Sequence, residues 1–276
     1  MKIIVCIKQV PETTEVRINP ETNTLIREGV KSIINPFDMY AIEEAVRLKE
    51  KFGGKVLVLT MGPPQADSAL REAIAMGADE GFLVCDRAFA GSDTWATSYT
   101  LANAIKKLGV LDGSTELTVN PEQSRRIDLI ICGKQASDGD TAQVGPGIAT
   151  HLNIPQVTYV KKIEEVTDKS MRVERMLEEG FEIIQTPLPA LLTVVKEINE
   201  PRIPSLRGLM RAKSVKITTF TQKELQLDPQ QIGLCGSPTQ VVKIFTPTPR
   251  TGGQMLTGEI PDIAKQLVDL IKDEVN

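Results

Sequence analysis

The chain has 276 residues, of which 41% are hydrophobic and 25% are charged, and its formal net charge is −4. This composition is typical of a globular protein with a substantial core, and it favours one large α/β domain with an extension. The acidic balance argues against nucleic acid or an anionic membrane as a partner. No signal segment or apolar run long enough for a membrane span is recognised, so we expect a cytoplasmic protein.

Short apolar runs alternate with amphipathic helical patterns through the first 150 residues. The runs predict strands over residues 3–7, 55–60, 81–85 and 127–132, because near-continuous apolar sequence suits strands covered on both faces. Helices are predicted from residue 36, over 64–76, over 94–108 and from about 141 to before Pro155. The alternation predicts a mostly parallel sheet with helices on both faces, a Rossmann-like α/β fold.

The first predicted helix has a recognisable start. Asn35 suits an N-cap and Pro36 suits the first turn. Its apolar stripe is predicted to run through residues 42, 45, 46 and 52. Glu43 and Arg47 are expected to pair on the solvent side of this helix.

Three further segments depart from this alternation. Residues 16–27 predict a small hairpin, and residues 112–125 predict a loop. After Pro155, strands predicted over 157–166, 171–186 and 190–198 form an antiparallel annex, the middle one bent at Gly180.

The C-terminal segment is predicted to be an extended arm. Residues 236–258 are rich in Pro, Thr and Gly, and an amphipathic helix follows. Its apolar face consists of Ile260, Ile263, Ala264, Leu267, Leu270 and Ile271. Such a face needs a surface to cover it, either the chain's own domain or, as we favour, a partner chain. We therefore expect an α/β domain over residues 1–234 and an arm over 235–276.

Ligands of an open parallel sheet bind outside the carboxyl ends of its strands. The segments predicted there are residues 8–11, 61–65, 86–94 and 133–145, together with the helix start at 35–38. They are rich in Gly and Pro, and most of them precede helix N-termini, whose free N–H groups suit an anion. One adenine nucleotide could contact all of them.

The segment "GKQASDGDTAQVG", residues 133–145, is not a triphosphate-binding loop. A Walker motif requires Gly where Asp128 stands and Ser or Thr where Gln135 stands, and no G-x-G-x-x-G motif is present. The loop is therefore not built for magnesium-assisted phosphoryl transfer.

The polar side chains of the same segment suggest another role. Asp138, Asp140, Thr141 and Gln143 are expected to cap the next helix and to orient backbone N–H groups toward a diphosphate. A capped turn without a ligand is the alternative.

The helix predicted over 94–108 has hydroxyl groups on its inward stripe. Thr94, Thr97 and Ser98 precede the apolar part of that stripe, which suggests that they face a polar ligand. The alternative is that these hydroxyls bond back to carbonyl groups four residues earlier.

Neither the cysteines nor the single histidine indicates a catalytic or metal site. Cys6, Cys85 and Cys132 end apolar runs, and small buried cysteines are the expectation. His151 lacks the G-x-S-x-G motif that a hydrolase triad would add. We expect no catalytic side chain and no metal.

The segment "VERMLEEGFEIIQTPLPALLT", residues 173–193, resembles the signature of electron transfer flavoprotein beta subunits. The features that match are Arg175, Glu178, Glu179, Gly180, Glu182, Pro189 and Thr193. "NPFD", "VRLKEK", "REAIAMGAD", "GKQA" and "NEPR" also fit, so the likeness spans nearly the whole chain.

The resemblance implies an adenine-nucleotide-binding domain in a heterodimer with an alpha subunit that holds FAD. It also implies that the arm reaches onto that alpha subunit and that residues 199–208 dock a partner dehydrogenase. The nucleotide would be contacted through Cys6, Asn35, Pro36, Phe37, Asp38, Met61, Gly133, Lys134, Gln135, Ala136, Ser137, Asp138, Gly139, Asp140, Thr141, Ala142, Gln143 and Val144.

The loop sequence "SDGDTAQVGPG" and the hydroxyl-rich "GSDTWATSYTLA" resemble the electron-bifurcating branch of the family. This likeness implies that the beta subunit binds a complete FAD. That FAD would take a hydride from NADH and send one electron to ferredoxin or flavodoxin and the other through the alpha-subunit FAD to the dehydrogenase. Thr94, Thr97 and Ser98 would then contact the flavin. The alternatives are a non-bifurcating beta subunit that binds AMP only and a nucleotide-binding regulatory module.

Overall fold

A computed structural model describes residues 1–12, 17–18, 25–26, 32–109, 126–242, 253 and 255–275. The predicted loop 112–125 lies outside these residues, and so does most of the predicted arm segment 236–258 beyond residue 242. The chain divides into two compact units, one of residues 1–17 and 25–242 and the other of residues 18–24 and 243–276. The boundary proposed at residue 235 stays a prediction.

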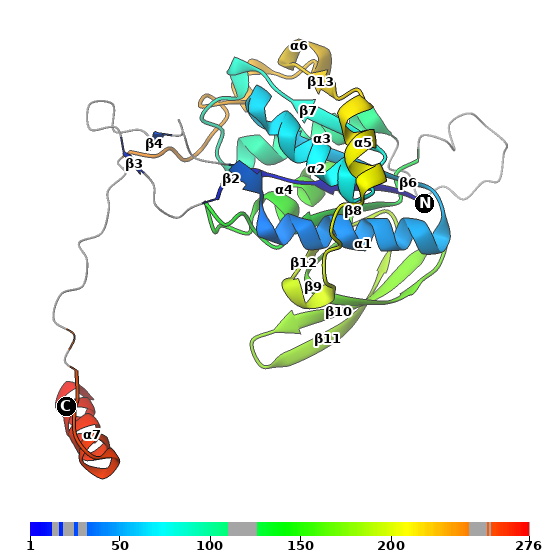
Figure 1. Cartoon of the computed structure of the whole chain (residues 1–276). Helices are drawn as coiled ribbons and strands as arrows, with labels where there is room; N and C mark the ends of the chain where they lie inside the picture. The colour runs from blue at the N-terminus through cyan, green and yellow to red at the C-terminus, as the bar shows by residue number, and fades with distance from the viewer. Residues whose placement is uncertain are drawn as a thin grey trace. The chain divides into compact units, whose positions relative to one another are not determined.

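The larger unit is built on a nine-stranded sheet in the order β11-β10-β9-β12-β8-β1-β6-β7-β13 (Figure 1). Its strands are β1 (Lys2–Cys6), β6 (Lys55–Met61), β7 (Glu80–Val84), β8 (Leu129–Gly133), β9 (Gln156–Val166), β10 (Ser170–Leu177), β11 (Gly180–Pro187), β12 (Ala190–Val194) and β13 (Thr218–Phe220). All neighbours from β9 to β13 are parallel, whereas β10 is antiparallel to both β9 and β11. The predicted fold class is confirmed.

Helices cover both faces of this sheet (Figure 1). The helices are α1 (Pro36–Phe52), α2 (Asp67–Met76), α3 (Thr94–Leu108), α4 (Val144–Leu152), α5 (Leu206–Ser214) and α6 (Gln222–Leu225). One buried cluster contains the inward residues of α1 and α2, and a second contains those of α3 and α4. Along β1, Ile3 and Val5 belong to the first cluster and Ile4 and Cys6 to the second, as strand alternation requires.

Short elements connect these layers. The pairs β2 (Gln9–Pro11) with β5 (Ser32–Ile34) and β3 (Arg17–Ile18) with β4 (Leu25–Ile26) each form a two-stranded sheet. The pairing of β3 with β4 agrees with the hairpin predicted over residues 16–27, whose remaining residues lie outside the described ranges. Single 3-10 turns occupy Pro64–Ala66, Arg87–Phe89, Lys196–Ile198 and Pro229–Gln231.

The strand order defines where a ligand can bind. β6 and β7 lie on one side of β1, while β8 and β12 lie on the other. The chain therefore reverses its direction of travel across the sheet between β1 and β8. In open α/β sheets this reversal opens a crevice at the carboxyl ends of the two strands.

The annex after Pro155 differs from the prediction in two ways. The strand predicted over 171–186 is a hairpin of β10 and β11, because Gly180 has a φ of 113° and begins a new strand instead of bending one. The last predicted strand, β12, is parallel to β8 and belongs to the main sheet. Within the nine-stranded sheet, only β9, β10 and β11 run antiparallel to one another in turn.

Two helix details were also predicted wrongly. The fourth helix begins at Val144 rather than near residue 141, because Asp140 and Ala142 have a φ of 54°, outside the helical range. Phe52, predicted inside the apolar stripe of α1, is 42% exposed at the last turn of the helix.

The smaller unit contains the helix α7 (Ile260–Val275). Ile260, Leu267, Leu270 and Ile271 of its predicted apolar face are exposed. None of the described helices combines the length and apolar character that a membrane span requires.

Candidate functional site

Asp38 is a buried carboxylate on which two strand ends converge. It lies in the first turn of α1 and is 5% exposed. The N–H of Lys8, after β1, donates to its Oδ2 at 2.7 Å, and the N–H of Gly133, at the end of β8, donates to its Oδ1 at 3.2 Å. Burial raises the pKa of Asp38 to about 7, although both hydrogen bonds act in the opposite direction. Asp38 thus joins the two strands that flank the reversal point.

Asn35 connects the start of α1 to the loop 133–145. Its Nδ2 donates to the carbonyl of Gln135 at 2.8 Å, and its Oδ1 accepts from the N–H of Ser137 at 3.0 Å. The prediction that the Asn35 side chain caps α1 is wrong, because both of its polar atoms are bonded to this loop and it makes no capping bond. Asn35 is 1% exposed, so its position is fixed by burial as well as by these bonds.

The end of the loop leaves a row of backbone donors free. Asp140 and Ala142 both have a φ of 54°, a conformation that non-glycine residues adopt at a cost. Within the described chain, the N–H groups of residues 141–145 have no hydrogen-bond acceptor, and the first bonded amide of α4 is that of Gly147. Free donors at a helix N-terminus are chemically suited to an anion.

Three of the four side chains predicted to cap α4 bind elsewhere. Asp138 forms an ion pair with Lys8 at 2.6 Å, and Asp140 accepts a hydrogen bond from the side chain of Gln135. Gln143 accepts one from α3. The prediction of a side-chain cap is therefore wrong, since α4 has none. As a consequence the helix N-terminus is open.

The hydroxyl groups of α3 lie against the start of α4. Thr94 Oγ1 donates to Gln143 Oε1 at 2.8 Å. Ser98 is buried, and its Oγ lies 2.6 Å from the carbonyl of Thr94 and 3.2 Å from that of Val144. Ser98 thus makes the back-bond that was the alternative to a ligand contact, and Thr97 is partly exposed. Contact of the three hydroxyls with a ligand stays a prediction.

The cysteines at the strand ends behave as small core residues in two of three cases. Cys6 and Cys132 are register partners in β1 and β8, and both are buried. Contact with the Cys6 thiol and burial both raise the pKa of Cys132. Cys85, expected to be buried, is partly exposed just after β7.

His151 belongs to an aromatic cluster. Its ring centroid lies 4.4 Å from that of Trp95 and 5.6 Å from that of Tyr99. Burial, together with the nearby charge of Lys106, lowers the pKa of His151. Its Nε2 has no hydrogen-bond partner among the described residues.

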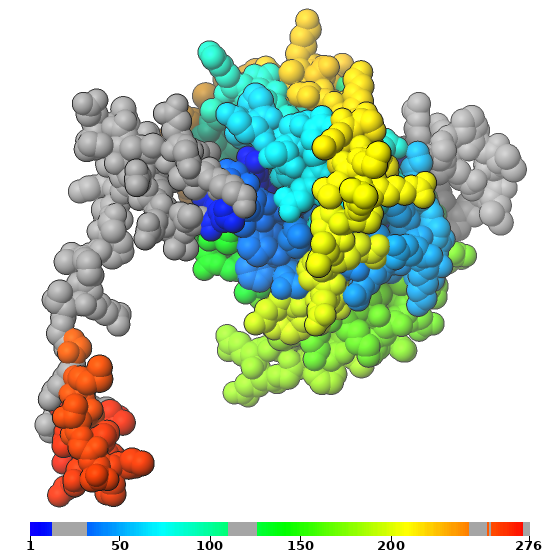
Figure 2. Space-filling model, viewed as in Figure 1, coloured from blue at the N-terminus to red at the C-terminus, as the bar shows by residue number. Residues whose placement is uncertain are grey.

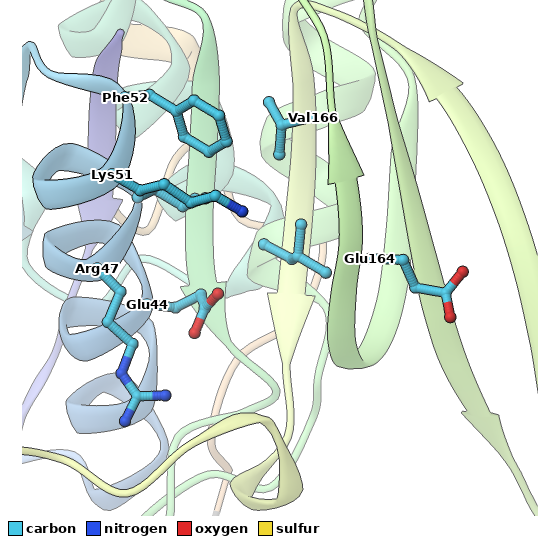
Figure 3. A pocket seen from close by; sticks show the side chains of 8 residues that line it. Glu44, Arg47, Lys51, Phe52, Glu164 and Val166 are labelled. Atoms are coloured by element: carbon cyan, nitrogen blue, oxygen red, sulfur yellow. The ribbon is translucent and has the colours of Figure 1, made fainter.

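A small pocket of about 100 Å³ lies between the second half of α1 and β9 (Figure 3). Charged side chains of Glu44, Arg47, Lys51 and Glu164 surround it. It is smaller than the 300–1,000 Å³ of ordinary ligand pockets, and it lies beyond Glu44, toward the opposite end of α1 from Asn35. It is therefore a surface hollow separate from the predicted nucleotide site.

The structure brings most of the predicted site residues into one network. The start of α1, the loop 133–144 and the first turns of α3 are joined by the hydrogen bonds described above. Met61, at the end of β6, and Thr97 make no side-chain hydrogen bond to this network in the described chain. The prediction that these segments meet at one edge agrees with this geometry.

Two residues of the network were missed from the sequence. Lys8 pairs with Asp138; the prediction included it only as part of the segment 8–11 and did not name it as a site residue. The ring of Tyr159 lies 5.5 Å from the Nζ of Lys134. Nothing in the sequence signals this contact, because Tyr159 lies inside a predicted strand.

The segment 199–208 is anchored to α1 by Arg202. Its Nε lies 2.8 Å from Glu43 and its Nη1 lies 2.6 Å from Glu50. Glu43, predicted on the solvent side, is only 3% exposed, because Arg202 and its own segment cover it. Burial alone would raise the pKa of Glu43, but the hydrogen bonds from Arg202 and Arg47 outweigh burial and lower the pKa of this carboxyl.

The same segment presents apolar side chains to solvent. Ile203 and Leu206 are 90% and 77% exposed. In the space-filling view this segment and α5, in yellow, lie on the surface over α1 and α2 (Figure 2). A fixed backbone with exposed apolar side chains is typical of a docking surface.

The fold is an α/β protein with unbonded backbone N–H groups in the loop that follows β8, beside the reversal point of its sheet. A family model described as the electron transfer flavoprotein domain matches residues 22–225. The chain is 53% identical over 272 residues to an electron transfer flavoprotein subunit beta of Thermoanaerobacterium thermosaccharolyticum, covering 98% of this chain and 97% of that protein.

Two further relatives extend the comparison. The caffeyl-CoA reductase-Etf complex subunit CarD of Acetobacterium woodii is 49% identical over 276 residues, covering 99% of each chain. Protein FixA of Azotobacter vinelandii is 47% identical over 254 residues, covering 91% of this chain and 86% of that protein. The chain therefore belongs to the electron transfer flavoprotein family, as a beta subunit, and the resemblance found in the sequence is confirmed.

We predict that the charge of Asp38 makes the stability of the fold depend on pH. Its folded pKa of about 7 exceeds the ordinary value of 3.8, so the protonated form of Asp38 stabilises the folded state. This contribution is full below about pH 4 and is lost as the pH rises through 7. Relative to the Asp38→Asn variant, the native chain should lose about 2–3 kcal/mol of unfolding free energy between pH 5 and pH 8. Chemical denaturation at both pH values measures this, and parallel pH dependences in the two proteins would contradict it.

A second prediction concerns the close approach of α1 to β8. A Cβ at Gly133 would lie 2.4 Å from Asp38 Oδ1 and 2.7 Å from the backbone carbon of Phe37, whereas a Cβ at Gly139 meets nothing within 4 Å. Gly133→Ala should therefore lower the free energy of unfolding by about 2–3 kcal/mol, and Gly139→Ala by less than about 1 kcal/mol. Equal stabilities of the two variants would show that the contact is not tight.

Proposed function

We propose that this beta subunit binds a complete FAD at the carboxyl ends of β1 and β8 and takes part in electron bifurcation. The observation that carries the proposal is the row of five free N–H groups at residues 141–145. A diphosphate requires several donors. Of the two exposed acids of the loop, Asp138 is paired with Lys8, and Asp140 accepts a hydrogen bond from the side chain of Gln135.

The residues present fit a dinucleotide. The N–H groups of residues 141–145 and the N-terminus of α4 would hold the diphosphate. Asn35 and Asp38 would hold the loop in position through their hydrogen bonds to Gly133, Gln135 and Ser137. Thr94, Thr97 and Ser98 would border the remaining part of the cofactor.

When bound, the flavin supplies the redox chemistry, accepting a hydride from NADH and releasing electrons singly. The chain itself contributes binding, orientation and electrostatics. The open N-terminus of α4 would stabilise a negative charge in its vicinity by about 0.3–1 kcal/mol when exposed and by more when buried. No side chain of the network is required as an acid or base.

The assembly follows from the family and from exposed apolar surfaces. The partner is an alpha subunit, and the arm from residue 235 onward would lie on it through the apolar face of α7. The segment 199–208 would dock a dehydrogenase through Ile203 and Leu206. Ferredoxin or flavodoxin would take the second electron.

The bifurcating role is supported by the loop sequence of residues 137–147 and by the names of two relatives, which fit this branch. The second candidate is a beta subunit that binds AMP alone, since the same donors would accept one phosphate. A regulatory nucleotide-binding module is disfavoured by membership of the family.

The flavin content of the purified heterodimer tests the proposal. Two flavins per heterodimer, together with ferredoxin reduction during anaerobic NADH titration, are the expected results. One flavin per heterodimer together with bound AMP would refute the bifurcating role and establish the second candidate, a one-electron carrier whose beta subunit binds AMP alone.

We further predict that Thr94→Val weakens retention of the beta-subunit FAD. The variant removes the hydrogen bond to Gln143 at the start of α4, a loss on the order of 1 kcal/mol or about fivefold in affinity. Thr100→Val is the matched control, since Thr100 is a buried hydroxyl of the same helix that bonds only to its own Ala96 carbonyl.

Flavin content after dialysis, with the alpha-subunit FAD as internal reference, provides the measurement. Equal loss from the Thr94 and Thr100 variants would refute a specific role for Thr94.

A further inference from the structure

Lys134 is a cation of the loop 133–145, and its ammonium group faces two aromatic rings. In the described chain no Asp or Glu pairs with it, whereas the neighbouring Lys8 is paired with Asp138. Its Nζ lies instead 5.4 Å from the ring centroid of Phe37 and 5.5 Å from that of Tyr159. Two aromatic rings therefore hold the ammonium group by cation–π contacts. In a chain of net charge −4, an unpaired and immobilised cation is a position for an anion.

Tyr159 reaches this position through a strained backbone. It has a φ of 59° inside β9, a left-handed conformation that is unfavourable for a bulky residue. The register of β9 against β12 passes from Val157 opposite Leu192 to Val160 opposite Val194. Two residues of β9 therefore lie opposite one residue of β12, which is a β-bulge.

The bulge lies level with the carboxyl end of the neighbouring strands. The N–H of Tyr159 donates to Thr193 Oγ1 at 3.2 Å. Val194, the next residue of β12, is the register partner of Gly133 and accepts the N–H of Lys134. Bulges of this kind re-aim a side chain next to a functional site, and here the re-aimed side chain is the ring beside Lys134.

We propose that Tyr159 is a positioning residue of the nucleotide site, which together with Phe37 holds the ammonium of Lys134 for the phosphate of the bound nucleotide. This inference rests on the proposed function, because it requires a phosphate-bearing ligand at the ends of β1, β8 and β12. It adds a residue outside the loop 133–145 and assigns the bulge of β9 to that role.

The test uses the complex with the alpha subunit, freed of nucleotide, and calorimetric titration with AMP and with uncharged adenosine. Tyr159→Leu should weaken AMP binding about three- to tenfold, because the ring on one side of the ammonium is lost. Adenosine binding should stay unchanged. Tyr159→Phe keeps the ring and should bind AMP within about twofold of the native complex.

Two further variants separate the effect of losing the ring from the effects of backbone strain and of general destabilisation. Tyr159→Gly removes the ring and relieves the positive φ, so it should weaken AMP binding as Tyr159→Leu does if the loss comes from the missing ring and not from a strained leucine. In a Lys134→Met background, Tyr159→Leu should have no additional effect on AMP binding.

The outcomes distinguish this inference from the proposed function. Three outcomes would overturn the role of Tyr159. Tyr159→Leu could bind AMP with native affinity, it could lose AMP and adenosine binding equally, or its effect could be undiminished in the Lys134→Met background. Failure of the unsubstituted complex to bind AMP would instead refute the nucleotide site itself.

Discussion

A buried carboxylate between two strand ends is the interaction on which the site depends. Asp38 can accept the N–H groups of both Lys8 and Gly133 only when β1 and β8 end at the same level and the first turn of α1 lies across them. A buried amide left without an acceptor would cost about 1–3 kcal/mol, so the arrangement is strongly determined. The loop that carries the free N–H groups begins at Gly133, so the contact with Asp38 determines where the loop starts and the path that it takes.

The helix α1 also connects the proposed nucleotide site to the segment 199–208, the proposed docking segment. Its first turn contacts the loop 133–145, and Glu43 and Glu44, about two turns further on, hold Arg202 and Asn199. A helix rises about 1.5 Å per residue, so the two contacts lie within roughly 10 Å along one rigid element. The bound cofactor and a docked partner would therefore have a fixed separation.

Sequence patterns predicted the elements better than their side-chain partners. The bounds of α3 were predicted as observed, because its apolar periodicity and its terminal glycine are strong local signals. The start of α4 was missed because Asp140 and Ala142 adopt left-handed conformations that no glycine marks. The roles of Asn35 and Glu43 depend on partners 100 and 159 residues away, which no local pattern encodes.

The central claim is that the free N–H groups of residues 141–145 bind the diphosphate of a complete FAD. A crystal structure of the heterodimer with its native cofactors tests this claim most directly. The account predicts diphosphate oxygens within hydrogen-bond distance of these N–H groups, with the flavin extending past the first turn of α3. A diphosphate held elsewhere, or a site that contains only a mononucleotide, would contradict it.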